Sequence, residues 1–253
     1  MGGMTEREVA ESAERALSLD DDSARWDIVA KLQADPGHAA FDAAERLCGA
    51  GEAKQRRMGA DILGQVGFTR EGGARVGPFR DEAMRVLLDL VEREEDPEVL
   101  ESVCTAFGHL NDPRAIGPLV RLRTHPDADI RFSVAFGLLA LPEREALDAL
   151  IQLSADPDVS VRDWATFGLG RQNEEDFPEL REALVARIDD PDEQTRAEAL
   201  YGLAVRGDRR ALGPLLIWRE NPWEESDYDL LEEALEALGE PRPWVSGGEQ
   251  GGA

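Results

Sequence analysis

The sequence contains few of the residues that build metal sites and disulfide frameworks. Its only cysteines are Cys48 and Cys104, which are too few for a disulfide framework, and both fall in apolar helical patterns. We therefore expect two buried, reduced thiols. The histidines are His38, His109 and His125, and the chain has no His-Glu-x-x-His motif and no His-Glu dipeptide. We expect no metal ion and no cofactor.

Long apolar runs are also missing. No stretch approaches the roughly 18 consecutive apolar residues that a membrane-spanning helix needs. The start of the chain, MGGMTEREV, lacks the hydrophobic region of a signal peptide. These absences predict a cytoplasmic protein that has no membrane partner.

Positive charge is scarce. The chain has 28 Lys and Arg against 53 Asp and Glu, a formal net charge of -25 at pH 7. Because the basic residues do not cluster, a nucleic-acid backbone would be repelled, and we expect no nucleic-acid partner. The acidity has two interpretations, which are adaptation for solubility or high salt and recognition of a basic partner.

A repeat is present instead. Residues 124–139 read THPDADIRFSVAFGLL and residues 155–170 read ADPDVSVRDWATFGLG. Each copy has an acid four residues before a reference position and an apolar residue seven after it. The frame recurs with these reference positions: Arg25, Arg56, Leu100, Arg131, Arg162, Arg196 and Leu231. The acids are Asp21, Glu52, Asp96, Asp127, Asp158, Asp192 and Asp227.

Each copy predicts a pair of helices. The acid is placed to accept hydrogen bonds from the first-turn amides of one helix, and a second leucine-rich segment precedes it, as at 145–155 and 179–189. A single hairpin cannot bury its own apolar face, so neighbours must stack. The sequence therefore predicts an all-α, right-handed superhelical solenoid of about seven hairpins over residues 5–240, with the second helix of each pair on the concave side.

These residues resemble the HEAT repeat, in the short bacterial form named after the phycobilisome lyases. The matching elements are the Asp-Pro-Asp start, the pair Val161-Arg162, the small residues that follow it and the terminal Leu-Gly. The resemblance implies a ladder of ion pairs between repeats, formed here by Arg131, Arg162 and Arg196 with Asp127, Asp158 and Asp192. Leu100 and Leu231 should interrupt it.

Two segments depart from the repeat. An insertion centred on 67–77, GFTREGGARVG, predicts a mobile surface loop, either a tolerated insertion or a partner contact. The tail at 241–253 is rich in Pro and Gly and predicts disorder.

Helical geometry indicates a candidate site. Positions one and five after the reference residue should face away from the core, with position two at the margin. Aromatic and acidic residues gather there in copies four to six: Phe132, Phe136, Asp163, Trp164, Phe167, Glu198 and Tyr201. An exposed aromatic patch surrounded by charge is typical of an interaction site. The alternative is that the rings are core between neighbouring helices.

The composition and this face together predict a non-catalytic scaffold or adaptor. It should be a monomer in isolation and bind a basic or Arg-rich protein through the concave face. The alternative is an enzyme of the HEAT superfamily, similar to the DNA glycosylases or bilin lyases. Asp163-Trp164 superficially fits a glycosylase, but inward acids such as Glu101 and Glu232 do not suit a duplex.

Overall fold

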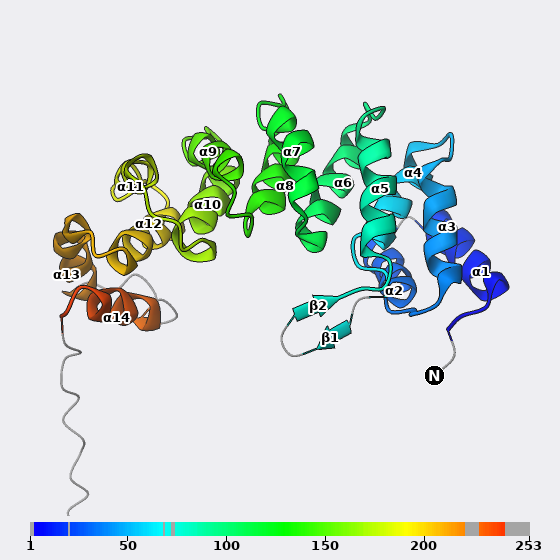
Figure 1. Ribbon diagram of the computed structural model, residues 1–253, viewed down its shortest axis with the longest axis horizontal. Coiled ribbons are helices and arrows are strands. Elements are labelled where there is room, and N and C mark those ends of the chain that lie inside the picture. The colour runs from blue at the N-terminus through cyan, green and yellow to red at the C-terminus, as the bar shows by residue number, and fades with distance from the viewer. Residues whose placement is uncertain (1–2, 20, 68, 72–73, 221–227, 241–253) are drawn as a thin grey trace, which may run out of the picture.

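The chain forms an arch of stacked helical hairpins in a computed structural model (Figure 1). The structure describes residues 3–19, 21–67, 69–71, 74–220 and 228–240. The first helices of the hairpins form the outer layer: α1 (Glu6–Ser18), α3 (His38–Cys48), α5 (Arg80–Val91), α7 (Ile116–Leu122), α9 (Arg144–Leu153), α11 (Pro178–Val185) and α13 (Leu212–Glu220). The second helices line the concave side: α2 (Asp22–Gln33), α4 (Ala53–Leu63), α6 (Pro97–Leu110), α8 (Ala128–Leu138), α10 (Val159–Phe167), α12 (Glu193–Val205) and α14 (Tyr228–Ala237). The prediction of seven hairpins is confirmed.

The repeated acids begin the inner helices, as predicted. In the described part of the chain each stands at the residue before its helix, and Asp21, Asp96, Asp127, Asp158 and Asp192 accept a first-turn backbone N–H. Glu52 stands at the same position without such a bond. Asp227 lies outside the described residues. The short aspartate side chain suits this cap because its carboxylate reaches the amides two and three residues ahead.

The apolar column forms the spine of the core. Each residue seven after a reference position is buried: Leu32, Leu63, Phe107, Leu138, Leu169, Leu203 and Leu238. They belong to one cluster of buried residues that extends from Val9 to Leu238. Cys48 and Cys104 are free and buried within it, as expected, and burial raises the pKa of each thiol to about 12. Both thiols are therefore inert apolar side chains at neutral pH.

The ladder between repeats exists, but the prediction of its acids was wrong. Arg131 pairs with Asp156 at 2.7 Å and Arg162 pairs with Asp190 at 2.8 Å. Each partner is the first acid of the next copy's Asp-Pro-Asp, whereas the predicted Asp158 and its equivalents cap their own helices. Burial acts to raise the pKa of Asp190, and the bonds from Arg162 and from the Asp192 amide outweigh it, so the pKa lies below its ordinary value.

The ladder is interrupted at the third copy, as expected. Upstream, Arg56 pairs with Glu94 at 2.6 Å. In the third copy, Leu100 takes the place of the arginine, and the position that would hold its acid is His125, whose Nδ1 accepts the Asp127 amide. Both members of the pair are thus replaced together, so that no buried charge remains alone.

The inserted segment contains more structure than the predicted loop. β1 (Thr69–Glu71) and β2 (Ala74–Val76) pair antiparallel, with Thr69 opposite Val76. They extend from the end of the arch that carries α2 (Figure 1). Within the described residues, none of the helices is long and apolar enough to cross a membrane. The tail predicted to be disordered, 241–253, lies outside them.

Candidate functional site

The predicted aromatic side chains meet on the inner face. We call Phe132, Phe136, Trp164, Phe167 and Tyr201 the aromatic row; all five are half-buried. The ring centre of Trp164 lies 5.4 Å from that of Phe132, 5.7 Å from Phe136 and 5.8 Å from Phe167, each in an edge-to-face arrangement. Trp164 of α10 therefore connects rings from α8 and α10, and such pairs prefer this geometry.

Glycines allow the row to form. The ring of Phe136 lies against Gly108 of α6, where an added Cβ would be 2.7 Å from two ring carbons. The same ring contacts His109 edge to face at 5.3 Å. Further along, a Cβ on Gly202 would lie 2.6 Å from the Cα of Gly170, so the segment after α10 and helix α12 touch through their backbones. Larger residues would push the inner helices apart.

A turn of π-helix extends α10 and places an arginine in the row. Residues Gly168–Gln172 form this turn, and it carries Arg171. The guanidinium carbon of Arg171 lies 5.6 Å from the ring centre of Phe167 and 5.4 Å from that of Tyr201. One guanidinium nitrogen is 3.4 Å from the carboxylate of Glu198. Arg171 thus joins Tyr201 to the rest of the row through cation–π contacts.

Arg206 stabilises the backbone of this turn. It donates hydrogen bonds to the carbonyl oxygens of Leu169, Gly170, Asn173, Glu175 and Gly202. Burial lowers the pKa of Arg206 below its ordinary value. These bonds satisfy carbonyl oxygens of the turn, of the segment that follows it and of α12, and so connect the three. π-helical turns are frequent at functional sites.

The two predicted acids occupy different environments. Glu198 is buried and pairs with Arg171 at 3.4 Å, whereas the sequence predicts that its position faces away from the core. Asp163 is half-buried, and its Oδ1 is buried without a hydrogen-bond partner among the described residues. Burial, reinforced by the charge of Asp192, raises the pKa of Asp163 to about 6.

No sequence pattern predicted a role for Arg171 or Arg206. Neither position belongs to the predicted inward set, because both follow the regular part of an inner helix. Their contacts depend on the π-helical turn and on the close approach of Gly170 to Gly202. A sequence pattern with a fixed helical period cannot describe either feature.

The first three copies carry no comparable row. The column that holds Phe136, Phe167 and Tyr201 holds Ala30, Asp61 and Thr105 there. Asp61 pairs with Arg25 at 3.2 Å, and both side chains are nearly inaccessible to solvent. Trp26 is 43% exposed, and the guanidinium carbon of Arg25 lies 5.1 Å from its ring centre.

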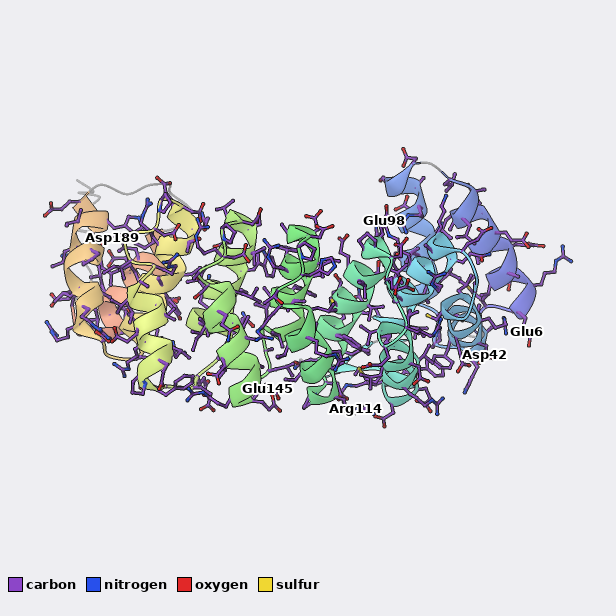
Figure 2. All side chains as sticks on the ribbon, turned by 90° about the horizontal axis from the view of Figure 1, so that it is seen from above. Glu6, Asp42, Glu98, Arg114, Glu145 and Asp189 are labelled. Carbon is purple, nitrogen blue, oxygen red and sulfur yellow. The ribbon has the colours of Figure 1, made fainter. Side chains whose placement is uncertain are left out.

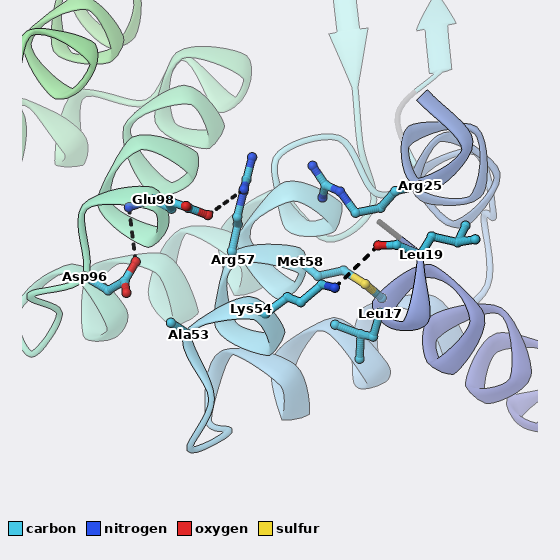
Figure 3. Close-up of a pocket in the computed structure, with 9 residues that line it drawn as sticks. All are labelled: Leu17, Leu19, Arg25, Ala53, Lys54, Arg57, Met58, Asp96 and Glu98. Carbon is cyan, nitrogen blue, oxygen red and sulfur yellow. Dashed lines mark hydrogen bonds and ion pairs between the residues drawn. The ribbon is translucent and has the colours of Figure 1, made fainter. Parts of the chain in front are cut away.

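A cavity of about 380 Å³ lies where α1, α2, α4 and α6 meet (Figure 3). Its walls combine the cations Arg25, Lys54 and Arg57 with apolar side chains, and Glu98 lies 2.7 Å from Arg57. Charges of both signs therefore compensate one another within it.

Acidic side chains are spread along the whole solenoid. Exposed acids extend from Glu6 at one end to Asp189 toward the other, with Asp42, Glu98 and Glu145 between them (Figure 2). In the described part of the chain no group of three His, Cys, Asp or Glu side chains is arranged to hold a metal ion.

Comparison with known proteins identifies the repeat. The family described as HEAT repeats matches residues 84–170 and 147–239. The chain belongs to the HEAT repeat family. Among curated protein sequences, none matches this HEAT repeat chain.

Solved structures share the HEAT repeat architecture. YibA of Escherichia coli superposes with a TM-score of 0.69 at 22% identity, covering 95% of this chain and 88% of that one. An archaeal HEAT-like repeats protein from Thermococcus onnurineus has a TM-score of 0.56 at 16% identity, covering 94% and 98%. The CpcE–CpcF complex of phycocyanin lyase from Nostoc gives 0.50 at 21%, covering 94% and 88%. At these identities the likeness concerns the fold alone.

Proposed function

We propose that this HEAT repeat protein is a non-catalytic scaffold or adaptor that binds another protein through the aromatic row. One observation carries the proposal. The first three copies build the same hairpin with Ala30, Asp61 and Thr105 in the column that holds the row's aromatic residues in copies four to six. Because the repeat folds without aromatic residues there, this difference supports a role for the row other than folding. Half-buried aromatic patches are the usual anchors of interfaces.

The charge of the chain favours a basic partner. The net charge of -25 attracts cationic surfaces from a distance and speeds their association, more strongly at low salt. Asp163 adds a carboxylate next to Trp164, so the face offers both an apolar contact and a negative charge. We propose further that the protein is a monomer until it meets this partner.

Catalysis is not part of the proposal. Neither the Arg171–Glu198 pair nor the carboxylate of Asp163 supplies a nucleophile held beside a base. Excision of alkylated bases, or transfer of a bilin chromophore, by the purified protein would contradict this part of the proposal.

Replacement of three rings tests the binding face. The variant carries Phe136→Ala, Phe167→Ala and Tyr201→Ala together. We expect partners captured from extracts of the source organism by the natural protein to be lost, and the affinity for a purified partner to fall by about 30-fold or more. Hydrogen exchange of the complex should show protection of α8, α10 and α12.

Two variants serve as controls. Trp26→Ala removes an exposed aromatic residue from the first copy and should leave binding unchanged. Leu169→Ala truncates a fully buried core residue and sets the scale of a folding defect, about 2–5 kcal/mol. If the triple variant unfolds, the rings serve packing and the proposal is wrong. The same conclusion follows if the triple variant loses more stability than Leu169→Ala while its folded fraction still binds the purified partner.

A further inference from the structure

We infer that the aromatic row binds an arginine side chain of its partner at Trp164, with Asp163 as the paired carboxylate. The inference rests on the proposed function and names the chemistry of its site. It follows from two neighbouring parts of the row, one that already contains a guanidinium and one that offers the same kinds of groups without it.

The occupied part shows how the row holds a cation. Arg171 lies against the rings of Phe167 and Tyr201, which come from neighbouring inner helices. Glu198 supplies the carboxylate at 3.4 Å. Two rings, one guanidinium and one carboxylate therefore form a unit within the protein.

The unoccupied part lies one helix earlier. Phe132 of α8 and Trp164 of α10 are in edge-to-face contact at 5.4 Å, and both are half-buried. Asp163 precedes Trp164. It directly follows the reference residue Arg162, as Phe132 follows Arg131 in the copy before. Its Oδ1 is buried, and none of the described residues donates a hydrogen bond to it. This part has two rings and a carboxylate but no cation.

The charges around Asp163 favour a cation from outside. Asp192 and Asp190 act on it as negative charges, and the nearby Arg162 is engaged in its bidentate pair with Asp190. An apolar segment would cover Asp163 and bury its carboxylate without a donor, which is costly. An anionic ligand would be repelled. A cationic side chain satisfies the carboxylate and the rings together.

Arginine fits better than lysine. A guanidinium is planar, so it can stack on Trp164 and still direct an N–H group in its plane to the carboxylate, whereas an ammonium is a compact and more strongly hydrated charge. The row itself uses arginine in its occupied part.

Three short labelled peptides test the inference with the full-length protein at 0.15 M salt. They have the sequence Gly-X-Gly-X-Gly, where X is arginine, lysine or the uncharged isostere citrulline. We expect the arginine peptide to bind about five-fold or more tightly than the lysine peptide, and the citrulline peptide not to bind. The indole N–H signal of Trp164 should shift with arginine.

Variants separate the site from the general acidity of the protein. Asp163→Asn should reduce arginine binding to the level of lysine, and Trp164→Leu should do the same by removing the stacking surface. Asp129→Asn removes one exposed acid from α8 and should keep the arginine preference. Equal binding of the arginine and lysine peptides would overturn the inference, and so would an equal effect of Asp163→Asn and Asp129→Asn.

The two proposals fail in different ways. If the peptides are not distinguished while the triple aromatic variant loses its natural partner, the arginine site is wrong and the binding face stands. If the arginine preference is present and depends on Asp163, but the triple variant keeps its partner, the proposed function is wrong and the site stands.

Discussion

The two halves of the inner face carry different side chains on the same repeat. In copies one to three, the column five residues after the reference position holds Ala30, Asp61 and Thr105, and the cavity between α1, α2, α4 and α6 is lined by charges of both signs. In copies four to six the same column holds aromatic rings, and the π-helical turn adds Arg171. The order of outer and inner helices, and the burial of the column seven residues after the reference position, are the same in both halves.

Some positions of the repeat are required by the fold, and others can vary without changing it. The capping acids and the column represented by Leu169 recur in both halves, so stacking depends on them. The inner column varies from alanine to tyrosine without altering the hairpin. Positions that vary in this way are available for recognition, since they can change at little cost to the core.

Breaking one ion pair of the ladder should cause the largest loss of stability. It tests how much these pairs between neighbouring repeats contribute to the second half of the solenoid. We expect Arg162→Leu to lower the free energy of unfolding by about 3 kcal/mol, because it removes the bidentate pair of the buried Asp190 and leaves its single ion pair with Arg187 at 3.2 Å. Chemical denaturation measures this loss. Arg7→Leu, at an 86% exposed side chain, should cost less than about 0.5 kcal/mol.

The third copy supplies the compensating change. It has leucine in place of the ladder arginine and histidine in place of the acid, so Arg162→Leu with Asp190→His copies an arrangement that the chain already contains. We expect the double variant to recover about half of the loss, since the buried carboxylate that has lost its bidentate partner is gone. A double variant no more stable than Arg162→Leu alone would show that the third copy is compensated elsewhere.

The sequence predicted the parts of the fold that repeat. The caps, the apolar column and the hairpin count depend on contacts within one copy or on a strict period. The ladder acids were misassigned because Asp-Pro-Asp offers two carboxylates. Spacing alone does not tell which of Asp156 and Asp158 turns toward the neighbouring repeat. The aromatic residues were predicted to share a face, but the contacts made by Arg171 require a non-periodic turn.

The boundary between the halves provides an intermediate effect. Gly108 of α6 makes room for the first ring of the row, and Gly108→Ala would place a methyl group 2.7 Å from carbons of Phe136. We expect a loss of about 1–3 kcal/mol from overpacking, measured by thermal or chemical unfolding. Adding Phe136→Ala should restore part of it, although the backbone oxygen of Phe136 also lies close, at 3.0 Å.

Gly213→Ala is the matched control for this change. Gly213 also lies in a helix, but a Cβ there would meet nothing within 4 Å. The substitution should leave the protein unchanged or stabilise it by up to about 1 kcal/mol, because alanine favours helix. If both glycine variants behaved alike, the ring of Phe136 would not be held against α6, and the row would be more mobile than its contacts indicate.

The smallest effect concerns Asp163, where binding and stability should move in opposite directions. Burial, then Asp192, raises the pKa of this carboxyl from 3.8 to about 6, so the folded state favours the protonated form and loses stability as the pH rises from about 4 through 6. Asp163→Asn removes this cost. Because the side chain is partly exposed, we expect a gain of about 1 kcal/mol at pH 7.5 and none near pH 4, measured by denaturation at both values. Asp129→Asn, at an exposed acid, should show no such dependence. A gain of the same size at pH 4 would mean that the carboxylate is not destabilised by burial. A more stable variant that no longer prefers arginine would indicate that the fold retains this carboxylate for the partner, at the expense of its own stability.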